Sequence, residues 1–192
     1  MRFSFFILSL YLFSSLQSQG IPDSIPVYKN IKKIDVSDSL VIAIKLKHKG
    51  YEMFPEEIRK YSSLRYLDLS GNKINSLPVW LKELKSLEYL KLSGNDFTRI
   101  DSSLVKLDLK YLDFGNNELD TIPDYIGEFN NLEYLILWSN NLVYFSDQLG
   151  KLSEMKKLDL RGMSIPYDVQ DPIKESLPKA KCYFDIPCNC HD

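Results

Sequence analysis

Residues 64–74 read LRYLDLSGNKI, and the same spacing returns along most of the chain. Apolar side chains stand at the first, fourth, sixth and eleventh positions of this stretch, and Asn72 stands at the ninth. Matching segments begin at residues 41, 64, 87, 109, 132 and 155, so the period is 22 or 23 residues. A fixed period of this length predicts a solenoid, in which each repeat buries its apolar side chains against its neighbours.

This pattern resembles the leucine-rich repeat family in its 22-to-24-residue form, and Leu77-Pro78 and Ile122-Pro123 match a Leu-Pro step common in that family. The resemblance implies a right-handed α/β solenoid with a parallel sheet on the concave side and short helical turns on the convex side. The stretch Val27-Tyr28-Lys29-Asn30 is similar to the leader of secreted repeat proteins from Bacteroidetes-type bacteria.

The remaining sequence predicts a signal peptide and two caps. Residues 1–20 combine a positive start, an apolar run too short to cross a bilayer and small residues before position 20. This indicates a secretory signal rather than a membrane anchor, hence a secreted or extracytoplasmic protein in the periplasm or at the cell surface. An N-terminal cap is expected over 21–40, repeats over 41–165 and a C-terminal cap over 166–192.

Three elements are expected in the caps. The first is a short helix over the open end of the core within residues 28–34. The second is a helix that starts at Asp171 with Pro172 at its first position and runs to about Leu177. The third is a closing strand at 181–184.

Charge is nearly balanced, with 24 Lys and Arg against 26 Asp and Glu. Two outward-facing columns alternate in sign from repeat to repeat, so their charges are expected to pair across neighbouring strands. Cations that are paired with carboxylates are not available to neutralise phosphates, so no nucleic-acid partner is expected. The second-position column is Ile42, Arg65, Glu88, Lys110, Glu133 and Lys156, and the fifth-position column is Lys45, Asp68, Lys91, Asp113, Ile136 and Asp159.

Aromatic residues form the candidate partner-binding site. A tyrosine occupies the third position of four consecutive repeats, as Tyr66, Tyr89, Tyr111 and Tyr134. This column either anchors a ligand or stacks on itself to stiffen the sheet. In the fifth repeat Ile136 interrupts the charge column and Trp138 replaces smaller residues. Tyr111, Tyr134, Ile136 and Trp138 are therefore the predicted ligand-contact patch, with packing beneath the C-terminal cap as the alternative.

Three cysteines lie near the C-terminus, beside His191. In an oxidising compartment we expect a cap disulfide from Cys182 to either Cys188 or Cys190. Binding of a soft metal ion is the alternative, but the spacing of these cysteines differs from that of usual structural metal sites. No metal and no cofactor are therefore expected.

Catalysis is not supported. His48 has no nucleophile or carboxylate at a catalytic spacing and is expected to be an exposed strand residue. Asp68, Asp113 and Asp159 lie about two strand spacings apart, with lysine between the first two. Common nucleotide, zinc and hydrolase motifs do not occur.

The sequence thus predicts a non-enzymatic protein-protein interaction module that holds a protein or peptide ligand on its concave face. A cell-surface glycan-binding protein is the first alternative, and a structural envelope or spacer protein without a ligand is the second. The oligomeric state stays open.

Overall fold

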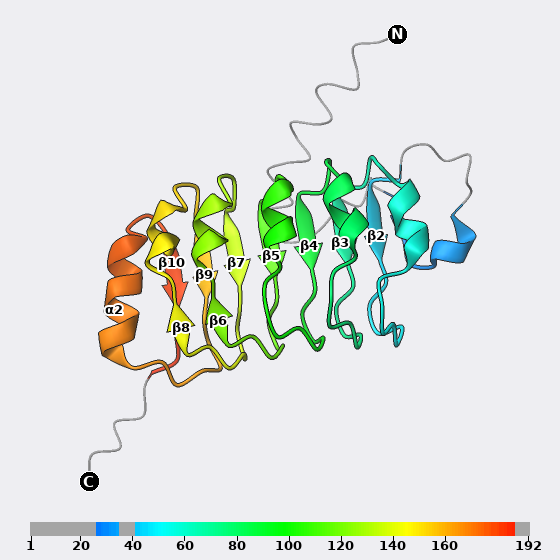
Figure 1. Ribbon diagram of the computed structural model, residues 1–192. Helices are drawn as coiled ribbons and strands as arrows, with labels where there is room; N and C mark the ends of the chain where they lie inside the picture. The colour runs from blue at the N-terminus through cyan, green and yellow to red at the C-terminus, as the bar shows by residue number, and fades with distance from the viewer. Residues whose placement is uncertain (1–25, 35–40, 187–192) are drawn as a thin grey trace.

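The computed structural model of the 192-residue chain describes residues 26–34 and 41–186. Its main feature is an eight-stranded parallel sheet in which the strands follow one another in chain order (Figure 1). A second, two-stranded parallel sheet pairs β6 (Thr121–Ile122) with β8 (Tyr144–Phe145). The eight strands are β1 (Val27–Tyr28), β2 (Ala43–Lys45), β3 (Tyr66–Asp68), β4 (Tyr89–Lys91), β5 (Tyr111–Asp113), β7 (Tyr134–Ile136), β9 (Lys157–Asp159) and β10 (Lys181–Tyr183).

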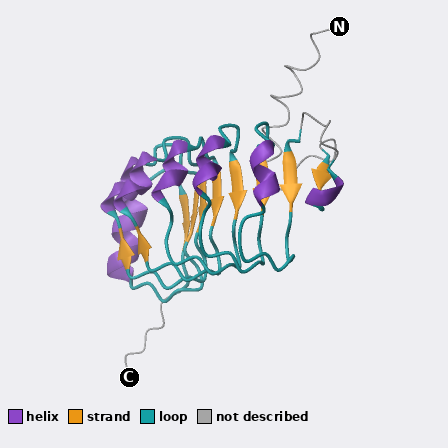
Figure 2. Ribbon diagram, turned by 45° about the vertical axis from the view of Figure 1, so that its right-hand side comes forward, coloured by secondary structure: helices purple, strands orange, loops and turns teal. Residues whose placement is uncertain are grey.

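Short helices form a second row alongside the strands (Figure 2). Proline fixes the extended residue before three of them, at Pro55, Pro78 and Pro123, whereas Asp101 and Ser146 cap two others through side-chain oxygens. The helices are the 3-10 helices η1 (Ile31–Lys33), η2 (Glu56–Lys60), η3 (Val79–Glu83), η4 (Ser102–Lys106), η5 (Asp124–Glu128) and η6 (Asp147–Lys151), and the α-helix α2 (Tyr167–Ser176).

The repeated apolar positions form one core between the two rows. The middle residue of each repeat strand shows this best, because all five leucines of that column have no exposed surface. Each buried aliphatic side chain contributes roughly 1.5–3 kcal/mol, and stacking lets neighbouring repeats share that gain. The column is Leu67, Leu90, Leu112, Leu135 and Leu158.

Asparagines at the ninth position join neighbouring repeats through their amides. Asn95 is typical: its Nδ2 donates to the carbonyls of Leu92 and Leu69, and its Oδ1 accepts from the Ile74 amide at 3.0 Å. One side chain thus satisfies buried backbone groups of two repeats. The predicted stack is confirmed, with equivalent bonds at Asn72, Asn117 and Asn140.

Each repeat turns inward just before this asparagine, through a residue in the left-handed region. Gly71, Gly94 and Gly162 take φ values of 68°, 64° and 77° there. Glycine suits this conformation because it has no Cβ. In the other three repeats a residue with a Cβ adopts the left-handed conformation, with φ values of 51–53° at His48, Asn116 and Ser139. The prediction that His48 is a strand residue is therefore wrong: it is exposed, but it lies in the turn after β2.

The ends of the solenoid differ in part from the expected caps. Within 28–34 the predicted helix is shorter than expected, because Val27 and Tyr28 add strand β1 to the sheet and only η1 is helical. The closing strand is confirmed as β10, which pairs with β9.

Helix α2 corrects the expected start at Asp171. It begins at Tyr167, so Pro172 lies inside the helix and not at its first position. Pro166 provides the extended N-cap residue, and its carbonyl accepts from the Val169 and Gln170 amides at 3.1 and 3.0 Å. The sequence contains two Pro residues that could open this helix, and the first one does so.

Within the described ranges, no helix is both long and apolar enough to cross a membrane. The predicted signal peptide over residues 1–20 lies outside those ranges, as do Cys188 and Cys190.

Candidate ligand-binding face

The outward side of the eight-stranded sheet carries the predicted contact residues. Strand register places equivalent positions of successive repeats directly beside one another, as Tyr89 beside Tyr66 and Asp68 beside Lys45. We call this side the concave face and define it as the second, third, fifth and seventh positions of the six repeats.

Charges of the second-position column pair across the strands, as predicted. Arg65 and Lys110 both contact Glu88, at 2.8 and 3.7 Å. Lys156 contacts Glu133 at 2.7 Å. These contacts link successive repeats.

The fifth-position column behaves differently, because the predicted pairing does not take the form of contact ion pairs there. Among the described residues no salt bridge joins neighbours in this column. The carboxylates of Asp68 and Asp113 instead accept the backbone amides two residues ahead, each at 3.0 Å. Lys91 extends over the rings of Tyr66 and Tyr111, with Nζ 5.8 and 5.0 Å from the centroids. A lysine above aromatic rings gains a cation–π interaction.

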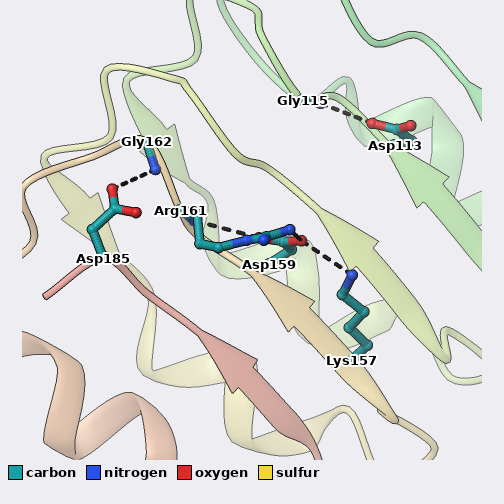
Figure 3. A network of polar contacts seen from close by, with 7 residues as sticks. All are labelled: Asp113, Gly115, Lys157, Asp159, Arg161, Gly162 and Asp185. Atoms are coloured by element: carbon teal, nitrogen blue, oxygen red, sulfur yellow. Dashed lines mark hydrogen bonds and ion pairs between the residues drawn. The ribbon is translucent and has the colours of Figure 1, made fainter.

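The pKa values of two carboxylates in this column, whose polar contacts are drawn in Figure 3, are shifted in opposite directions. Burial raises the pKa of Asp113, although the Gly115 amide and the charge of Lys91 oppose the shift. Burial also acts on Asp159, but hydrogen bonds from Arg161 and Lys157 outweigh it and lower its pKa. The contacts are short, since Arg161 Nη2 lies 2.6 Å and Lys157 Nζ 3.1 Å from Oδ2.

The four tyrosines stack on one another. Successive ring centroids lie 6.3, 6.3 and 5.8 Å apart, with interplanar angles of 26–29°. Tyr66 and Tyr89 are only 5% and 4% exposed, whereas Tyr111 and Tyr134 are half-buried. Burial raises the pKa of Tyr89 to about 12. The first two rings therefore offer little surface to a ligand.

Trp138 is the large apolar side chain that this face exposes, with 38% of its surface accessible. Its indole lies over Gly115 of the preceding repeat, where a Cβ would collide with ring atoms Nε1 and Cδ1. The sequence indicated that Trp138 replaces smaller residues of earlier repeats, but it did not indicate that one of them, Gly115, makes room for the indole.

Ile136, the other residue of the predicted patch in the fifth repeat, is only 6% exposed and pairs in register with Asp113 and Asp159. Ile136 therefore offers little surface to a ligand. Arg161 and Tyr183, which the sequence did not single out, lie nearby instead. Register places Arg161 beside Trp138 and Tyr183 beside Asp159, and the Arg161 guanidinium lies 5.5 Å from the Tyr183 ring centroid.

The cysteine and metal predictions are tested only in part. Cys182 lies in β10 beside Leu158 and packs against the core, and burial raises the pKa of its thiol. Its predicted partners, Cys188 and Cys190, are outside the described residues. In the part of the chain that the structure describes, no three His, Cys, Asp or Glu side chains gather as metal ligands.

Residues of β8 and α2, which lie side by side at one end of the solenoid (Figure 1), line two cavities away from the concave face. These cavities, of about 460 and 320 Å³, share the side chains of Phe145 and Val169. Tyr144 and Tyr167 are exposed nearby. No sequence pattern predicted these cavities.

A family model described as "Leucine-rich repeat region" matches residues 39–182. A comparison with curated proteins gives no significant match. Among solved structures, a leucine-rich repeat protein of Leptospira interrogans is 32% identical with a TM-score of 0.63, and the match covers 74% of this chain and 35% of that one.

Two further structures share the fold at lower identity. Internalin C2 of Listeria monocytogenes is 23% identical with a TM-score of 0.63, over 76% of this chain and 62% of its own. The plant peptide hormone receptor RGFR1, solved in complex with RGF2, is 23% identical with a TM-score of 0.52, over 70% of this chain and 24% of its own. The chain thus spans less than two thirds of each of these three structures. The family match, the repeat geometry and the asparagine stack agree, and the chain belongs to the leucine-rich repeat family.

Proposed function

We propose that this protein is a non-enzymatic, secreted or surface-exposed binding module that holds a protein or peptide on its concave face. The observation that carries the proposal is the exposed indole of Trp138, seated over Gly115 on a sheet whose backbone is fixed by its neighbours. Large aromatic side chains on rigid surfaces are the usual anchors of protein interfaces, because little ordering entropy is lost when they bind.

The family supports this class of function. Leucine-rich repeats generally serve protein-protein interaction and are typically non-enzymatic. RGFR1, which shares the fold, is a peptide hormone receptor solved with RGF2. Extended concave surfaces of solenoids suit such ligands. We take Tyr111, Tyr134, Trp138 and Arg161 as the contact residues.

A glycan ligand is the second candidate, because a flat, accessible indole also suits the apolar face of a sugar ring. The two candidates differ in what they bind. A glycan-binding protein should bind soluble sugar and be indifferent to protease treatment of its target, whereas a protein-binding module should lose its target to protease.

The test is affinity capture with the immobilised full chain from extracellular protein and envelope glycan fractions. Trp138→Ala is run beside the wild type, and Val143→Ala serves as the matched control because Val143 is exposed on the same repeat but outside the concave face. All three proteins must melt at the same temperature.

A partner that the wild type and the control retain and Trp138→Ala loses supports the proposed site. Equal capture by all three variants would move the search to the cavities between β8 and α2. Empty captures throughout would favour a structural protein without a ligand.

A further inference from the structure

We propose that the concave face binds an acidic, extended peptide, with Trp138 contacting an apolar side chain and the cations of β9 and β10 contacting carboxylates. This inference rests on the proposed binding function and adds the chemistry of the partner. It follows from the number of charges on the face, from their relative exposure and from their position.

The concave face carries an excess of positive charge. Across the six repeats its positions hold eight cationic side chains against five carboxylates, although the whole chain has a net charge of -2. The remainder of the chain is therefore acidic, and the concave face has the opposite sign. The cations are Lys45, Lys47, Arg65, Lys91, Lys110, Lys156, Lys157 and Arg161, and the carboxylates are Asp68, Glu88, Asp113, Glu133 and Asp159.

Within the ion pairs of this face, the cation is always the more exposed partner. The Arg161 side chain is 54% exposed and the Asp159 side chain 2%, and Lys156 and Glu133 show 46% and 17%. The same order holds for both cations that contact Glu88. The aspartates of the fifth position are short and buried, and backbone amides also donate to their carboxylates. The longer basic side chains are more exposed. An approaching ligand therefore meets ammonium and guanidinium groups first.

The exposed cations lie on the strands that follow the Trp138 repeat, and Arg161 is the one beside that repeat's turn. Lys156 precedes β9, Lys157 is its first residue, and Arg161 follows the strand. Lys181 continues the same surface on β10, where it pairs with Lys157. Neighbouring strands lie about 4.8 Å apart, so an extended chain that crosses from β9 to β10 passes one strand every one or two residues and can meet cations of both. The indole beside this group provides an apolar contact at its edge.

The same features disfavour a nucleic acid. A duplex binder neutralises about 6–10 phosphates, whereas the excess here is three charges above a layer of carboxylates. A peptide that alternates carboxylates with apolar side chains fits both the cations and the indole.

The experiment is selection of a random peptide display library on the immobilised full chain, followed by affinity measurements with one enriched peptide. Lys156→Gln/Lys181→Gln removes one exposed charge from the concave face and one from its continuation on β10, and keeps most of each aliphatic side chain. The matched control is Lys82→Gln/Lys106→Gln, which removes two exposed lysines from the helical side. Melting temperatures confirm that all variants fold.

We expect enriched peptides with net negative charge and apolar residues, whose affinity falls about tenfold in the concave variant and about twofold or less in the control. The affinity should also fall as salt is raised. Neutral or basic peptides that depend on Trp138 would overturn the acidic preference and leave the binding function intact.

Two other results would overturn the proposal. If heparin or single-stranded DNA of matched charge displaced the peptide equally well, the face would be a general polyanion surface. If no peptide were enriched on the wild type, the proposed binding function and this inference would both fail.

Discussion

Single residues at fixed positions of the repeat determine how neighbouring repeats contact one another. The side-chain amide of Asn95 hydrogen-bonds one buried backbone amide, that of Ile74, and two buried carbonyls, those of Leu69 and Leu92. Trp138 and Gly115 form a matched pair, because the indole occupies the space that a side chain at Gly115 would need. Small changes at either kind of position should therefore have specific and measurable effects.

Replacing Asn95 with Ala should lower the free energy of unfolding by about 3 kcal/mol, because buried backbone groups of two repeats lose their partners. Urea denaturation followed by circular dichroism measures this loss. Asn75→Ala, at an exposed asparagine of the second repeat, should stay within about 0.5 kcal/mol of the wild type. Equal losses for both variants would contradict a special role for the ninth position.

Replacing Gly115 with Ala should displace the Trp138 indole without unfolding the chain. The new Cβ collides with the ring, and the ring can move outward because solvent lies beyond it. Acrylamide quenching in a Trp80→Phe background reports on Trp138 alone and should become more efficient. Gly150→Ala, where the Cβ would meet Ser176 at an ordinary 3.4 Å, should leave the quenching unchanged. Unchanged quenching in Gly115→Ala would rule out the seat described for Trp138.

Asp159 and Asp113 should affect stability with opposite dependence on pH. Because the folded-state pKa of Asp159 is lowered, its contribution is complete above the ordinary value of 3.8 and is lost as pH falls below it. Asp159→Asn should therefore cost about 1 kcal/mol at pH 7, a modest value because its partners Arg161 and Lys157 are exposed to solvent, and nothing in strong acid.

The ionised carboxylate of Asp113 has the opposite effect on stability, because the folded-state pKa of Asp113 is raised. Its ionised carboxylate costs stability at neutral pH, and that cost disappears as pH falls through its folded pKa towards 3.8. Asp113→Asn keeps an oxygen for the Gly115 amide and should be at least as stable as the wild type at pH 7. Urea titrations at pH 7 and pH 3 compare both variants, and parallel losses for the two would contradict these assignments.

Among elements, α2 contains an internal proline, whereas the sequence led us to expect that proline at the start of the helix. Pro172 is its sixth residue, so the Asp168 carbonyl lacks the amide that normally follows four residues later. The helix nevertheless forms because Ile173 and Leu177 are buried against the core.

Pro172→Ala should therefore stabilise the protein by about 1 kcal/mol, after allowance for the greater flexibility that alanine gives the unfolded chain. Thermal unfolding monitored at 222 nm measures the change. Pro178→Ala, beyond the helix, is the control and should give no such gain. A lower melting temperature for Pro172→Ala would show that the proline ring contributes more by packing than the missing helical hydrogen bond costs.

The repeat elements were predictable from sequence because their apolar period is unbroken, and the closing strand β10 continues the same alternation. The boundaries at the ends were less predictable. Val27 and Tyr28 pair with β2 through backbone hydrogen bonds, which any sequence can make, so no side-chain pattern marked β1. Of Pro166 and Pro172, the sequence alone could not say which one opened α2.

For the molecule as a whole, the sequence correctly placed the outward columns but not the relative exposure of their side chains. The alternation of charge signs suggested that each column pairs its charges. In the fifth-position column, however, the carboxylates accept backbone amides of the following turn, and Lys91 lies over a tyrosine ring. The tyrosine column appeared equally available in every repeat, but stacking buries Tyr66 and Tyr89. The usable surface is therefore concentrated around Trp138, Arg161 and β10.

The central claim is that partners bind this surface, and hydroxyl-radical footprinting of the chain with and without its captured partner or selected peptide tests it most directly. Trp138 reports on the concave face and Tyr183 on its continuation in β10, whereas the similarly exposed Tyr144 and Tyr167 report on the region near β8 and α2 in the same sample. The account predicts that the ligand protects Trp138 and Tyr183 from oxidation and leaves Tyr144 and Tyr167 unchanged. Protection of Tyr144 and Tyr167 with unaltered oxidation of Trp138 would contradict it.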